Sequence, residues 1–466
     1  MHARLAIAVS LILVVPEVAN AGGYYVPEVG PRAASMGGAL AAQDADASAI
    51  FHNPAGIVGQ PGSQVQVVGT LFFPNVEFFR RPIPDPNSPD NNVISFGASS
   101  NTNTVGLAPY LGATSDLGNR KLAIGLALSV PFGAAIDYAD DSSQRHVVTH
   151  VSLAAIHLSP AIAYQVSDRF RVGASVNLIH TTLRLEQRNA IPYLTGDPEV
   201  FPDPDPALEG DTVLDGSDPF SLSATIGALY TSPSRRVQIG VSVLTPVTLK
   251  LRGDASVSNS AITPLIDANG NELQPAGQRT DAFTSEIPLP MIARVGIAAR
   301  PTSQLTIVAD VNWQRWSAFD ELVIDFENEH ELLPTPGAFL YDVAVENSWS
   351  DTFSVRLGAE VTPLATRPLQ VRGGLLYDQS PVDDGHYDLI TPDSDKFGVG
   401  LGAGYRFIVG SGVAVDIDIA YQHLFVAERD IGQSEKTILN KPASSFYSGV
   451  ARARFDILQL GANVRF

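Results

Sequence analysis

The most conspicuous chemically active residues are carboxylates gathered in one stretch. Residues 189–218 contain no Lys or Arg but eight acidic residues, namely Asp197, Glu199, Asp203, Asp205, Glu209, Asp211, Asp215 and Asp218. Carboxylate oxygens are typical Ca²⁺ ligands. A solvated acidic surface, bridged to lipopolysaccharide by divalent ions, explains the run equally simply, so we assign no metal ligand to it.

Catalytic patterns are weak in this sequence. The histidines His146, His150, His157 and His180 lie in or beside expected strands, with no serine at a defensible spacing and no GxSxG turn. The Gly-rich string GAGYRF (402–407) lacks the third glycine and the following helix of a dinucleotide site. We therefore expect no enzyme activity and no cofactor, and keep a lipid hydrolase only as a minor alternative.

Composition narrows the class of protein further. The formal net charge is −19, with 30 Lys and Arg against 49 Asp and Glu, which argues against a nucleic-acid partner. The chain has no cysteine, so disulfide scaffolds and thiolate metal sites are excluded. Only 17% of the residues are charged, below the roughly 25% usual for soluble domains.

The first 21 residues have the three parts of a secretory signal. Arg4 provides a positive start, an apolar run follows at residues 5–15, and Ala19-Asn20-Ala21 forms a small-x-small cleavage site. We predict a signal peptide over 1–21. No later stretch approaches the roughly 18 apolar residues that a transmembrane helix needs.

Beyond residue 63, small or polar side chains alternate with apolar ones, which is the period of β-strands. In RFRVGASVNLI (169–179), for example, small and polar residues share one face and apolar residues share the other. Fourteen such segments can be placed, near 64–73, 103–114, 121–131, 147–164, 169–186, 219–230, 236–252, 283–299, 304–320, 352–362, 369–379, 396–407, 412–426 and 446–466. An even number suits a bacterial barrel with both termini in the periplasm.

The connections between these segments alternate strictly in length. Short turns are expected at 115–120, 165–168, 231–236, 300–303, 362–367 and 408–412, with long connections between them. A soluble β-sandwich has no reason to keep this alternation. The sequence therefore predicts an all-β fold, a 14-stranded antiparallel transmembrane β-barrel.

Several strings also resemble the FadL family of outer-membrane transporters. They are GGYYVPE (22–28), ADASAIFHNPAGI (45–57), EIPLPMIARVGIAAR (286–300) and the run Trp316-Ser317-x-Phe319-x-x-Leu322, in that order along the mature chain. The resemblance implies an N-terminal plug, or hatch, inside the lumen. We expect a plug over 22–62 and the barrel over 63–466, and a plugged lumen disfavours a general porin.

The resemblance also suggests roles for residues of the plug and the third strand. Tyr24 stands where the family has an aromatic residue that reaches the ligand. Asn53, Pro54 and Ala55 are expected to close the plug, with Asn and Pro fixing a turn. In the third strand, Pro131 and Gly133 interrupt the run of residues that can pair, and the family has a lateral gap at this strand.

The remaining expectations concern the substrate. The family uses a basic residue late in the fifth strand, near which Arg184 and Arg188 lie, and we add Trp316 and Phe319 as ligand contacts. A second basic position of the family is Val323 here, which favours a neutral compound. The implied function is gradient-driven outer-membrane transport of hydrophobic compounds by a monomer, with long-chain fatty acids as the first expectation and neutral aromatic or aliphatic hydrocarbons as the alternative.

Overall fold

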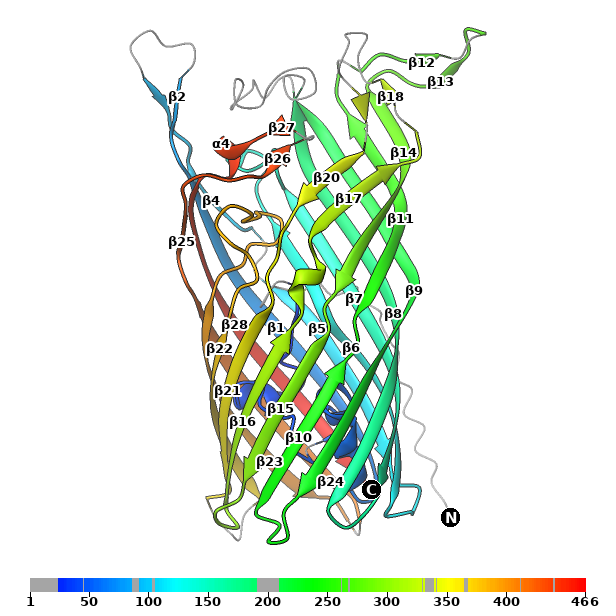
Figure 1. Cartoon of the computed structure of the whole chain (residues 1–466), viewed down its shortest axis with the longest axis vertical. Helices are drawn as coiled ribbons and strands as arrows, with labels where there is room; N and C mark the ends of the chain where they lie inside the picture. Colours follow the sequence, from blue (N-terminus) through cyan, green and yellow to red (C-terminus); the bar gives the residue numbers. More distant parts are fainter. Residues whose placement is uncertain are drawn as a thin grey trace.

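The chain forms a tall, closed β-barrel with short helices inside it, in a computed structural model (Figure 1). The structure describes residues 24–44, 46–85, 92–102, 105–190, 209–260, 262–266, 269–328, 330–331, 339–340, 342–363, 368–410, 412–438 and 441–466. The predicted signal peptide lies outside these residues. None of the described helices is long and apolar enough to cross a bilayer.

Fourteen antiparallel strands make the wall, and six of them consist of two pieces. In wall order they are β1 (Ser63–Arg80), β4 with β5 (Ala98–Ser100, Gly106–Ser115), β6 (Leu122–Asp137), β7 (His150–Gln165), β8 (Phe170–Ala190), β9 (Glu209–Thr231), β10 with β11 (Val237–Leu244, Val247–Ser258), β15 with β14 (Ile292–Ala299, Gln278–Leu289), β16 with β17 (Leu305–Gln314, Glu321–Phe326), β21 with β20 (Thr352–Val361, Val343–Glu346), β22 (Leu369–Asp378), β23 (Lys396–Ile408), β24 with β25 (Ala414–Val426, Arg429–Ile431) and β28 (Gly449–Arg465).

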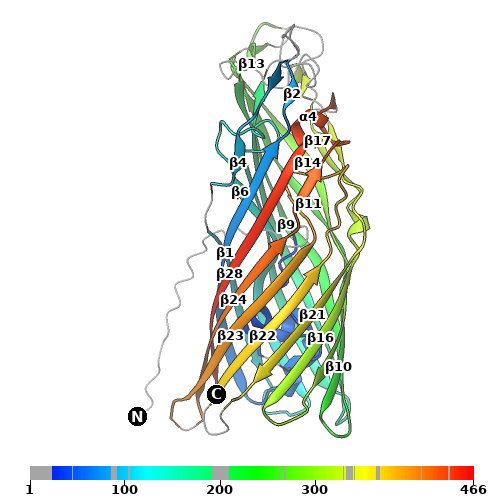
Figure 2. The same ribbon diagram turned by 90° about the vertical axis from the view of Figure 1, so that its left-hand side faces the viewer.

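The barrel closes between the first and last wall strands. β1 and β28 pair from Gln64↔Arg465 to Arg80↔Gly449, so that the sheet has no free edge at this seam. Each predicted strand segment corresponds to one of the fourteen wall strands, and the short turns gather at one end of the barrel (Figure 2). The predicted fold is therefore confirmed. Connection lengths alternate because successive connections lie at opposite ends of the barrel, the short turns at one end and the long connections at the other.

Breaks within the wall strands follow from local sequence. Pro246 separates β10 from β11 and Pro290 separates β14 from β15, because proline has no N–H to donate to a ladder. Between β16 and β17 the chain coils into the 3-10 turn η3 (Trp316–Ala318). Small hairpins and one helix decorate the opposite end from the short turns, namely β2–β3 (Ile83–Pro84, Val93–Ile94), β12–β13 (Leu265–Ile266, Glu272–Gln274), β18–β19 (His330–Glu331, Phe339–Leu340), β26–β27 (Thr437–Ile438, Lys441–Pro442) and α4 (Ser444–Tyr447).

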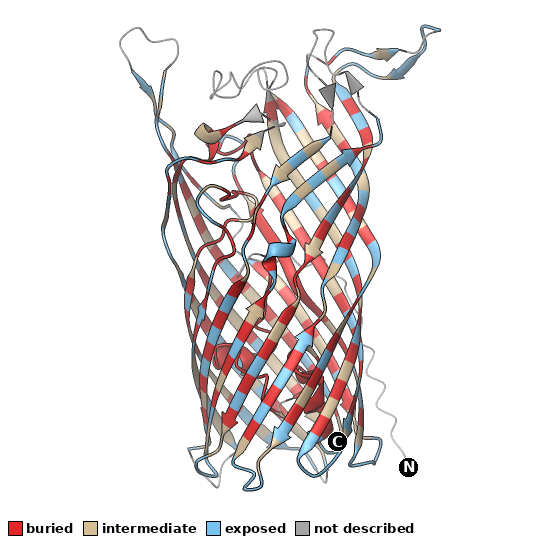
Figure 3. Ribbon diagram, viewed as in Figure 1, coloured by how far each residue is buried: buried red, intermediate tan, exposed pale blue. Residues whose placement is uncertain are grey.

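Side chains along the wall are arranged inside out relative to a soluble protein. In β10, Ile239 and Val241 are exposed, whereas Gln238 and Ser242 are buried in the lumen. Figure 3 shows this alternation of exposed and buried residues along the wall strands. An apolar outer face and a polar inner face are the pattern of a barrel surrounded by lipid.

The N-terminal residues before β1 fold inside the lower half of the barrel, where Figure 1 shows them in dark blue. They form α1 (Pro31–Ser35), α2 (Ala49–His52) and η1 (Pro54–Gly59). Each helix is short: Pro31 starts α1, and Asn53 ends α2 in an extended conformation while capping η1. We call residues 24–62 the plug.

Candidate functional site

The wall is incomplete beside β6. The β5–β6 ladder ends at Leu111↔Leu128, whereas β6 continues to Asp137 and stays paired with β7 beyond a register shift between Ser129 and Phe132. The third strand therefore does not stop at Pro131. Its upper half leaves β5, so that the edge at Pro131 and Gly133 is not paired with a wall strand. Further along, the Thr102 N–H donates to the Asp137 carbonyl at 2.7 Å, and Asn101 forms a bridge with Tyr138.

The plug occupies that free edge with its own backbone. The Val26 N–H donates to the Pro131 carbonyl at 2.8 Å, and the Gly133 N–H donates to the Tyr24 carbonyl at 2.8 Å. Pro131 has no N–H that would need an acceptor, and its carbonyl oxygen still accepts a hydrogen bond. The start of the plug thus acts as a short extra strand beside β6.

Below the gap, a small cavity lies where the plug meets the first three wall strands. Val26 and Glu28 of the plug line it together with Thr70, Tyr110 and Ser129. Burial raises the pKa of the Glu28 carboxyl, the largest influence, and the neighbouring Arg356 opposes it. The Arg356 guanidinium lies 3.4 Å from the Glu28 carboxyl.

Aromatic rings surround Tyr24 at the centre of the lumen. Its ring centroid lies 5.0 Å from that of Trp316 and 6.0 Å from those of Phe319 and Trp349. These pairs are tilted or edge to face, the arrangements that aromatic quadrupoles favour. We call Tyr24, Trp316, Phe319 and Trp349 the aromatic cluster, which brings together three predicted ligand contacts from distant parts of the chain.

An apolar cavity of about 80 Å³ lies directly beside this cluster. Its lining is mostly aliphatic and consists of Tyr24, Ala134, Val151, Leu153, Leu183, Leu185, Leu214, Phe283, Ser285, Ile287, Phe319, Leu322, Ile324, Asn347, Asp388, Ile390 and Thr391. An engineered cavity of roughly 150 Å³ holds benzene in another protein. The cavity described here therefore has to widen when it takes up a ligand of that size.

One end of the cavity is polar but electrically balanced. Asp388 lies in the lining, and its carboxylate is 3.2 Å from the buried Lys436 ammonium. Lys436 also donates to the Asn347 side chain at 2.7 Å and to the Glu346 carbonyl at 2.9 Å. An ammonium has three donors, so these partners use its capacity.

The two arginines expected to hold a carboxylate lie elsewhere. Arg184 is exposed and contacts Glu186 and Asp215, on the opposite face of β8 from the cavity-lining Leu183 and Leu185. Arg188 contacts Glu209 at 3.5 Å and also pairs with Asp211. Neither arginine lines the cavity, and acidic residues from the end of the 189–218 stretch neutralise both.

Position 323 also faces away from the cavity. Val323 is exposed on the outer face of β17, whereas its neighbours Leu322 and Ile324 line the cavity. In this register a basic residue at position 323 would not point at a ligand in the cavity. The missing charge thus says nothing about what the cavity holds.

Asn53 fastens the plug to the wall. Its amide nitrogen donates to the carbonyls of Ala41 at 2.7 Å, Ala228 at 3.1 Å and Val241 at 3.3 Å, and its oxygen accepts from the Ala55 N–H at 3.1 Å. The motif Asn53-Pro54-Ala55 is completely buried and remote from the apolar cavity. This geometry supports the predicted role in plug closure.

Two wall glycines make that contact possible. A Cβ on Gly173 of β8 would come within 2.5 Å of the Ala55 backbone nitrogen. A Cβ on Gly227 of β9 would overlap the Asn53 side-chain oxygen. The wall is therefore shaped to the plug at this point.

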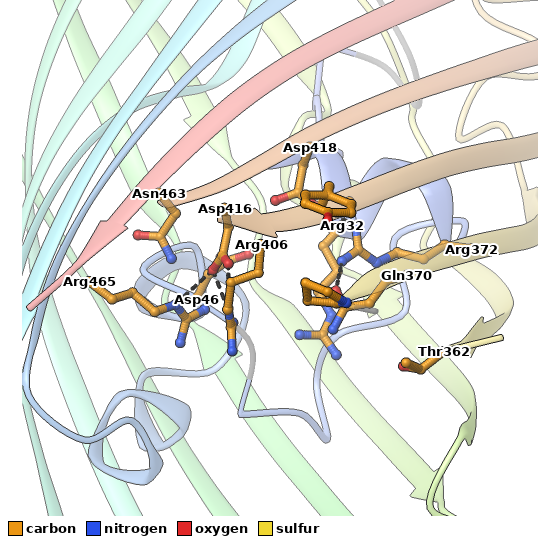
Figure 4. Close-up of a pocket in the computed structure, with 13 residues that line it drawn as sticks. Arg32, Asp46, Thr362, Gln370, Arg372, Arg406, Asp416, Asp418, Asn463 and Arg465 are labelled. Carbon is orange, nitrogen blue, oxygen red and sulfur yellow. Dashed lines mark hydrogen bonds and ion pairs between the residues drawn. The ribbon is translucent and has the colours of Figure 1, made fainter. Parts of the chain in front are cut away.

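A second, charged cavity of about 190 Å³ lies under α1, near the end with the short turns (Figure 4). Arg32 of the plug pairs with Glu360 at 2.9 Å, and Arg372 bonds both Glu360 at 2.7 Å and Asp418. Figure 4 also shows Asp416 between Arg406 and Arg465. Because carboxylates already pair with these arginines, we read the cavity as an ionic anchor for the plug.

Burial sets the protonation of two plug side chains. The pKa of the Tyr24 hydroxyl is raised by burial, so this group stays a neutral donor. Burial also lowers the pKa of His52 to about 4, although the bond between its Nε2 and the Val29 carbonyl at 2.9 Å opposes that change. Both groups are therefore uncharged at neutral pH.

The histidines do not take part in a cluster that could hold a metal ion in the part of the chain that the structure describes. Burial lowers the pKa of His146 to about 3, and its Nδ1 lies 3.2 Å from the Arg188 carbonyl oxygen. Within the described ranges, no group of three or more His, Asp or Glu side chains is arranged to hold a metal. Much of the acidic stretch, 191–208, lies outside those ranges.

Sequence reasoning missed three residues of the site. Trp349, Asp388 and Lys436 come from long connections that bend back over the lumen. The one sequence signal was Trp349 itself, because only three tryptophans occur in the chain. Neither Asp388 nor Lys436 stands out among the other charged residues of these connections.

Comparisons with known proteins agree with this architecture. Residues 12–466 match the family described as outer membrane protein transport protein (OMPP1/FadL/TodX). An outer membrane protein of Neisseria meningitidis serogroup B is 26% identical over 91% of both chains, and the 47 kDa outer membrane protein of Pasteurella multocida is 24% identical over 96% of this chain and 97% of its own.

Solved structures share the fold at low sequence identity. A FadL homologue of Pseudomonas aeruginosa has a TM-score of 0.77 and 19% identity, covering 95% of this chain and all of the other. The P. putida toluene transporter TodX has a TM-score of 0.64 and 15% identity, covering 96% of this chain and 99% of its own. The TM-scores show that the fold is shared. At these low identities the substrate has to be inferred from the cavity.

Proposed function

Because this chain belongs to the OMPP1/FadL/TodX family, and so is an outer-membrane transporter of hydrophobic compounds, we propose that its substrates are neutral aromatic or aliphatic hydrocarbons. The observation that carries this proposal is the lining of the apolar cavity, which contains no Lys, Arg or His. A buried carboxylate without a cation would be costly. A hydrocarbon needs only the apolar walls.

Ligand contacts follow from the same geometry. Tyr24 and Phe319 line the cavity, and Trp316 packs edge to face against Tyr24 behind them. These rings offer a flat aromatic substrate the tilted contacts that they already make with one another. The ligand site is thus built jointly by the plug and by the chain segment between β16 and β17.

The route past the plug follows the free edge of β6. A substrate leaves the cavity when the backbone bonds of Tyr24 and Val26 to β6 open, and Pro131 and Gly133 are the residues of β6 that make those bonds. Transport runs down the concentration gradient, and retention in lipid or consumption by the cell maintains that gradient. The fully buried aromatic cluster and the plug keep the lumen closed to ions between events.

Long-chain fatty acids are the second candidate, and Lys436 is the observation in their favour. Its ammonium lies at the polar end of the cavity. It would donate hydrogen bonds to the carboxylate of a bound fatty acid if that carboxylate took the place of Asp388. That exchange would leave Asp388 buried and unpaired, which disfavours it. We therefore rank neutral compounds first.

Binding of toluene against oleate by the purified barrel tests the ranking. We expect saturable toluene binding, and oleate binding at least tenfold weaker. Lys436→Gln, which keeps a donor for Asp388, should leave toluene affinity unchanged. Tight oleate binding that is lost in Lys436→Gln would show instead that the carrier recognises fatty acids.

A further inference from the structure

The wall is interrupted a second time, between β14 and β17. The β15–β16 ladder begins at Ile292↔Gln314, and the β14–β17 ladder covers only residues 283–285 and 324–326. Between these ladders, residues 286–291 face residues 315–323, all of them described, and no ladder pair joins the two. The links at the margins are the Arg315 N–H to the Met291 carbonyl at 2.9 Å and the Ser285 hydroxyl to the Val323 carbonyl at 2.7 Å.

Local sequence prevents the ladder from continuing. Pro288 and Pro290 carry no N–H, so this stretch of β14 lacks two donors. On the other side, the chain coils into η3, which Figure 1 shows as a short coiled ribbon in the wall below β17 and β20. The coil turns Trp316 into the lumen and leaves Ser317 and Ala318 exposed. The interruption is therefore built by both strands.

The interruption lies just beyond the lipid-facing part of the barrel. Along β16 the outward residues Ile307 and Val311 are exposed and apolar. Immediately afterwards the exposed residues are Arg315, Ser317, Ala318 and Asp320, three of them polar or charged. A change from apolar to polar outward residues marks the edge of the hydrocarbon layer, on the side of the long connections.

Two hollows meet at this place from opposite sides of the wall. Outside is a depression of about 570 Å³, lined by Thr248, Thr284, Ser285, Glu286, Pro288, Ala318, Asp320, Glu321, Val323 and Asp325. Inside is the apolar cavity, to which Ser285 also belongs. Along β17, Val323 and Asp325 line the outer depression while Leu322 and Ile324 line the inner cavity. A single layer of residues therefore separates the two hollows.

The closure consists of side chains rather than of a strand ladder. The Tyr24 hydroxyl donates to the Pro288 carbonyl at 2.7 Å, and the Ser285 hydroxyl donates to the Val323 carbonyl at 2.7 Å. Phe319 fills the space behind them. None of these contacts is a ladder pair, so a rearrangement of these side chains is compatible with intact β14–β17 and β15–β16 ladders.

We propose that this interruption is a second opening, through which a neutral hydrophobic compound enters the inner cavity from the outer surface just above the lipid. The inference rests on the proposed function and adds an entry route to it. Glu286, Asp320, Glu321 and Asp325 place four carboxylates in the lining of the depression, and Lys250 lies 3.9 Å from Glu286 beside it. Such a mouth disfavours anions, in agreement with a neutral cargo.

Blocking the depression tests the opening. The chain has no cysteine, so Ala318→Cys can be labelled alone with a bulky biphenyl maleimide. Ser317→Cys is the matched control, exposed one residue away but not part of the depression. With Trp313, which is half-buried on the outer side of β16, replaced by Phe in every protein compared, only Trp316 and Trp349 remain. Bromobenzene, a neutral quencher, would then report arrival at the aromatic cluster through their fluorescence in a stopped-flow experiment.

We expect labelled Ala318→Cys to associate with bromobenzene at least tenfold more slowly, with an unchanged dissociation constant, while labelled Ser317→Cys behaves like the unlabelled protein. Val323→Phe, which fills the depression without a label and adds no tryptophan, should also slow association. If labelled Ala318→Cys and Val323→Phe both associate as fast as the unlabelled barrel, the second opening is overturned and the proposed function stays intact. If bromobenzene does not quench the fluorescence of the unlabelled barrel, both the second opening and the proposed function are overturned.

Discussion

The Tyr24 hydroxyl donates a 2.7 Å hydrogen bond to the carbonyl oxygen of Pro288, which lies 264 positions further along the chain. The backbone carbonyl of the same tyrosine accepts from the Gly133 N–H on β6. Tyr24 therefore contacts both the edge of β6 and the interruption between β14 and β17. Tyr24 thus links the edge of β6 to residues 286–291 of the wall.

Removing the Tyr24 ring should weaken ligand binding more than removing its hydroxyl. Tyr24→Ala takes away a wall of the cavity, and we expect the dissociation constant for toluene to rise at least tenfold, about 1.4 kcal/mol. Tyr24→Phe keeps the ring and should stay within about threefold of the original. Isothermal titration or intrinsic fluorescence measures both. Equal losses in the two variants would contradict a packing role for the ring.

A reversible lock at the β6 edge should stop transport. Tyr25 and Phe132 form an antiparallel bridge flanked by the bonds of Tyr24 and Val26, which makes them a closely spaced pair. The double variant Tyr25→Cys with Phe132→Cys can thus form a disulfide. We expect hydrocarbon uptake to cease on oxidation and to return on reduction. Each single cysteine variant is the control, and continued uptake by the oxidised double variant would exclude this route.

Loss of Asn53 should loosen the plug. Asn53→Ala removes four hydrogen bonds at a buried position, one of them the bond that the Ala55 N–H donates to the Asn53 side chain. Unsatisfied buried groups cost about 1–3 kcal/mol each. We expect larger ion conductance in planar bilayers and faster proteolysis of the plug. Asn119→Ala, in an exposed turn, should change neither quantity.

Plug docking should weaken in mild acid through His52. Its pKa falls from 6.5 to about 4 when the plug is docked, because burial disfavours the charged ring. Between pH 6.5 and 4, His52 therefore binds a proton in the released plug but stays neutral in the docked plug. Docking free energy is therefore complete above pH 6.5 and falls by about 3 kcal/mol as the pH drops to about 4. Conductance should rise from pH 7.5 to pH 5, and His52→Gln should abolish most of this dependence.

Substitution of Arg184 and Arg188 should leave ligand affinity unchanged. Arg184 and Arg188 pair with carboxylates and do not line the cavity. We expect Arg184→Ala and Arg188→Ala to bind toluene and oleate as the unmodified barrel does. A selective loss of oleate binding in Arg188→Ala would mean that a fatty acid is held near the long connections rather than in the cavity.

Sequence patterns predicted the wall well because lipid imposes a strict rule on it. Outward residues have to be apolar and inward residues small or polar, so each wall strand can be recognised in the sequence by this alternation. The strand containing Pro131 and Gly133 shows how far this reasoning goes. The missing N–H of Pro131 pointed to this part of the strand, but only the structure shows that the backbone of plug residues 24–26 pairs with it.

The register of the fifth wall strand shows where the reasoning fails. A shift of one residue turns each side chain to the other face, and family position alone could not decide whether Arg184 or Leu183 faces the lumen. Residues such as Lys436 and Asp388 lie in long connections, whose path no periodicity encodes. Their meeting depends on packing between segments distant in the chain.

The tight fit between plug and wall also fixes an order of events during biogenesis. Gly173 and Gly227 leave no spare room around Asn53-Pro54-Ala55, and β1 is sealed to β28 along its whole length. In a finished barrel the plug could reach this position only through one end of the lumen, past side chains that already fill it. We therefore expect the plug to be enclosed while the wall is still open, with the seam between the first and last strands closing last.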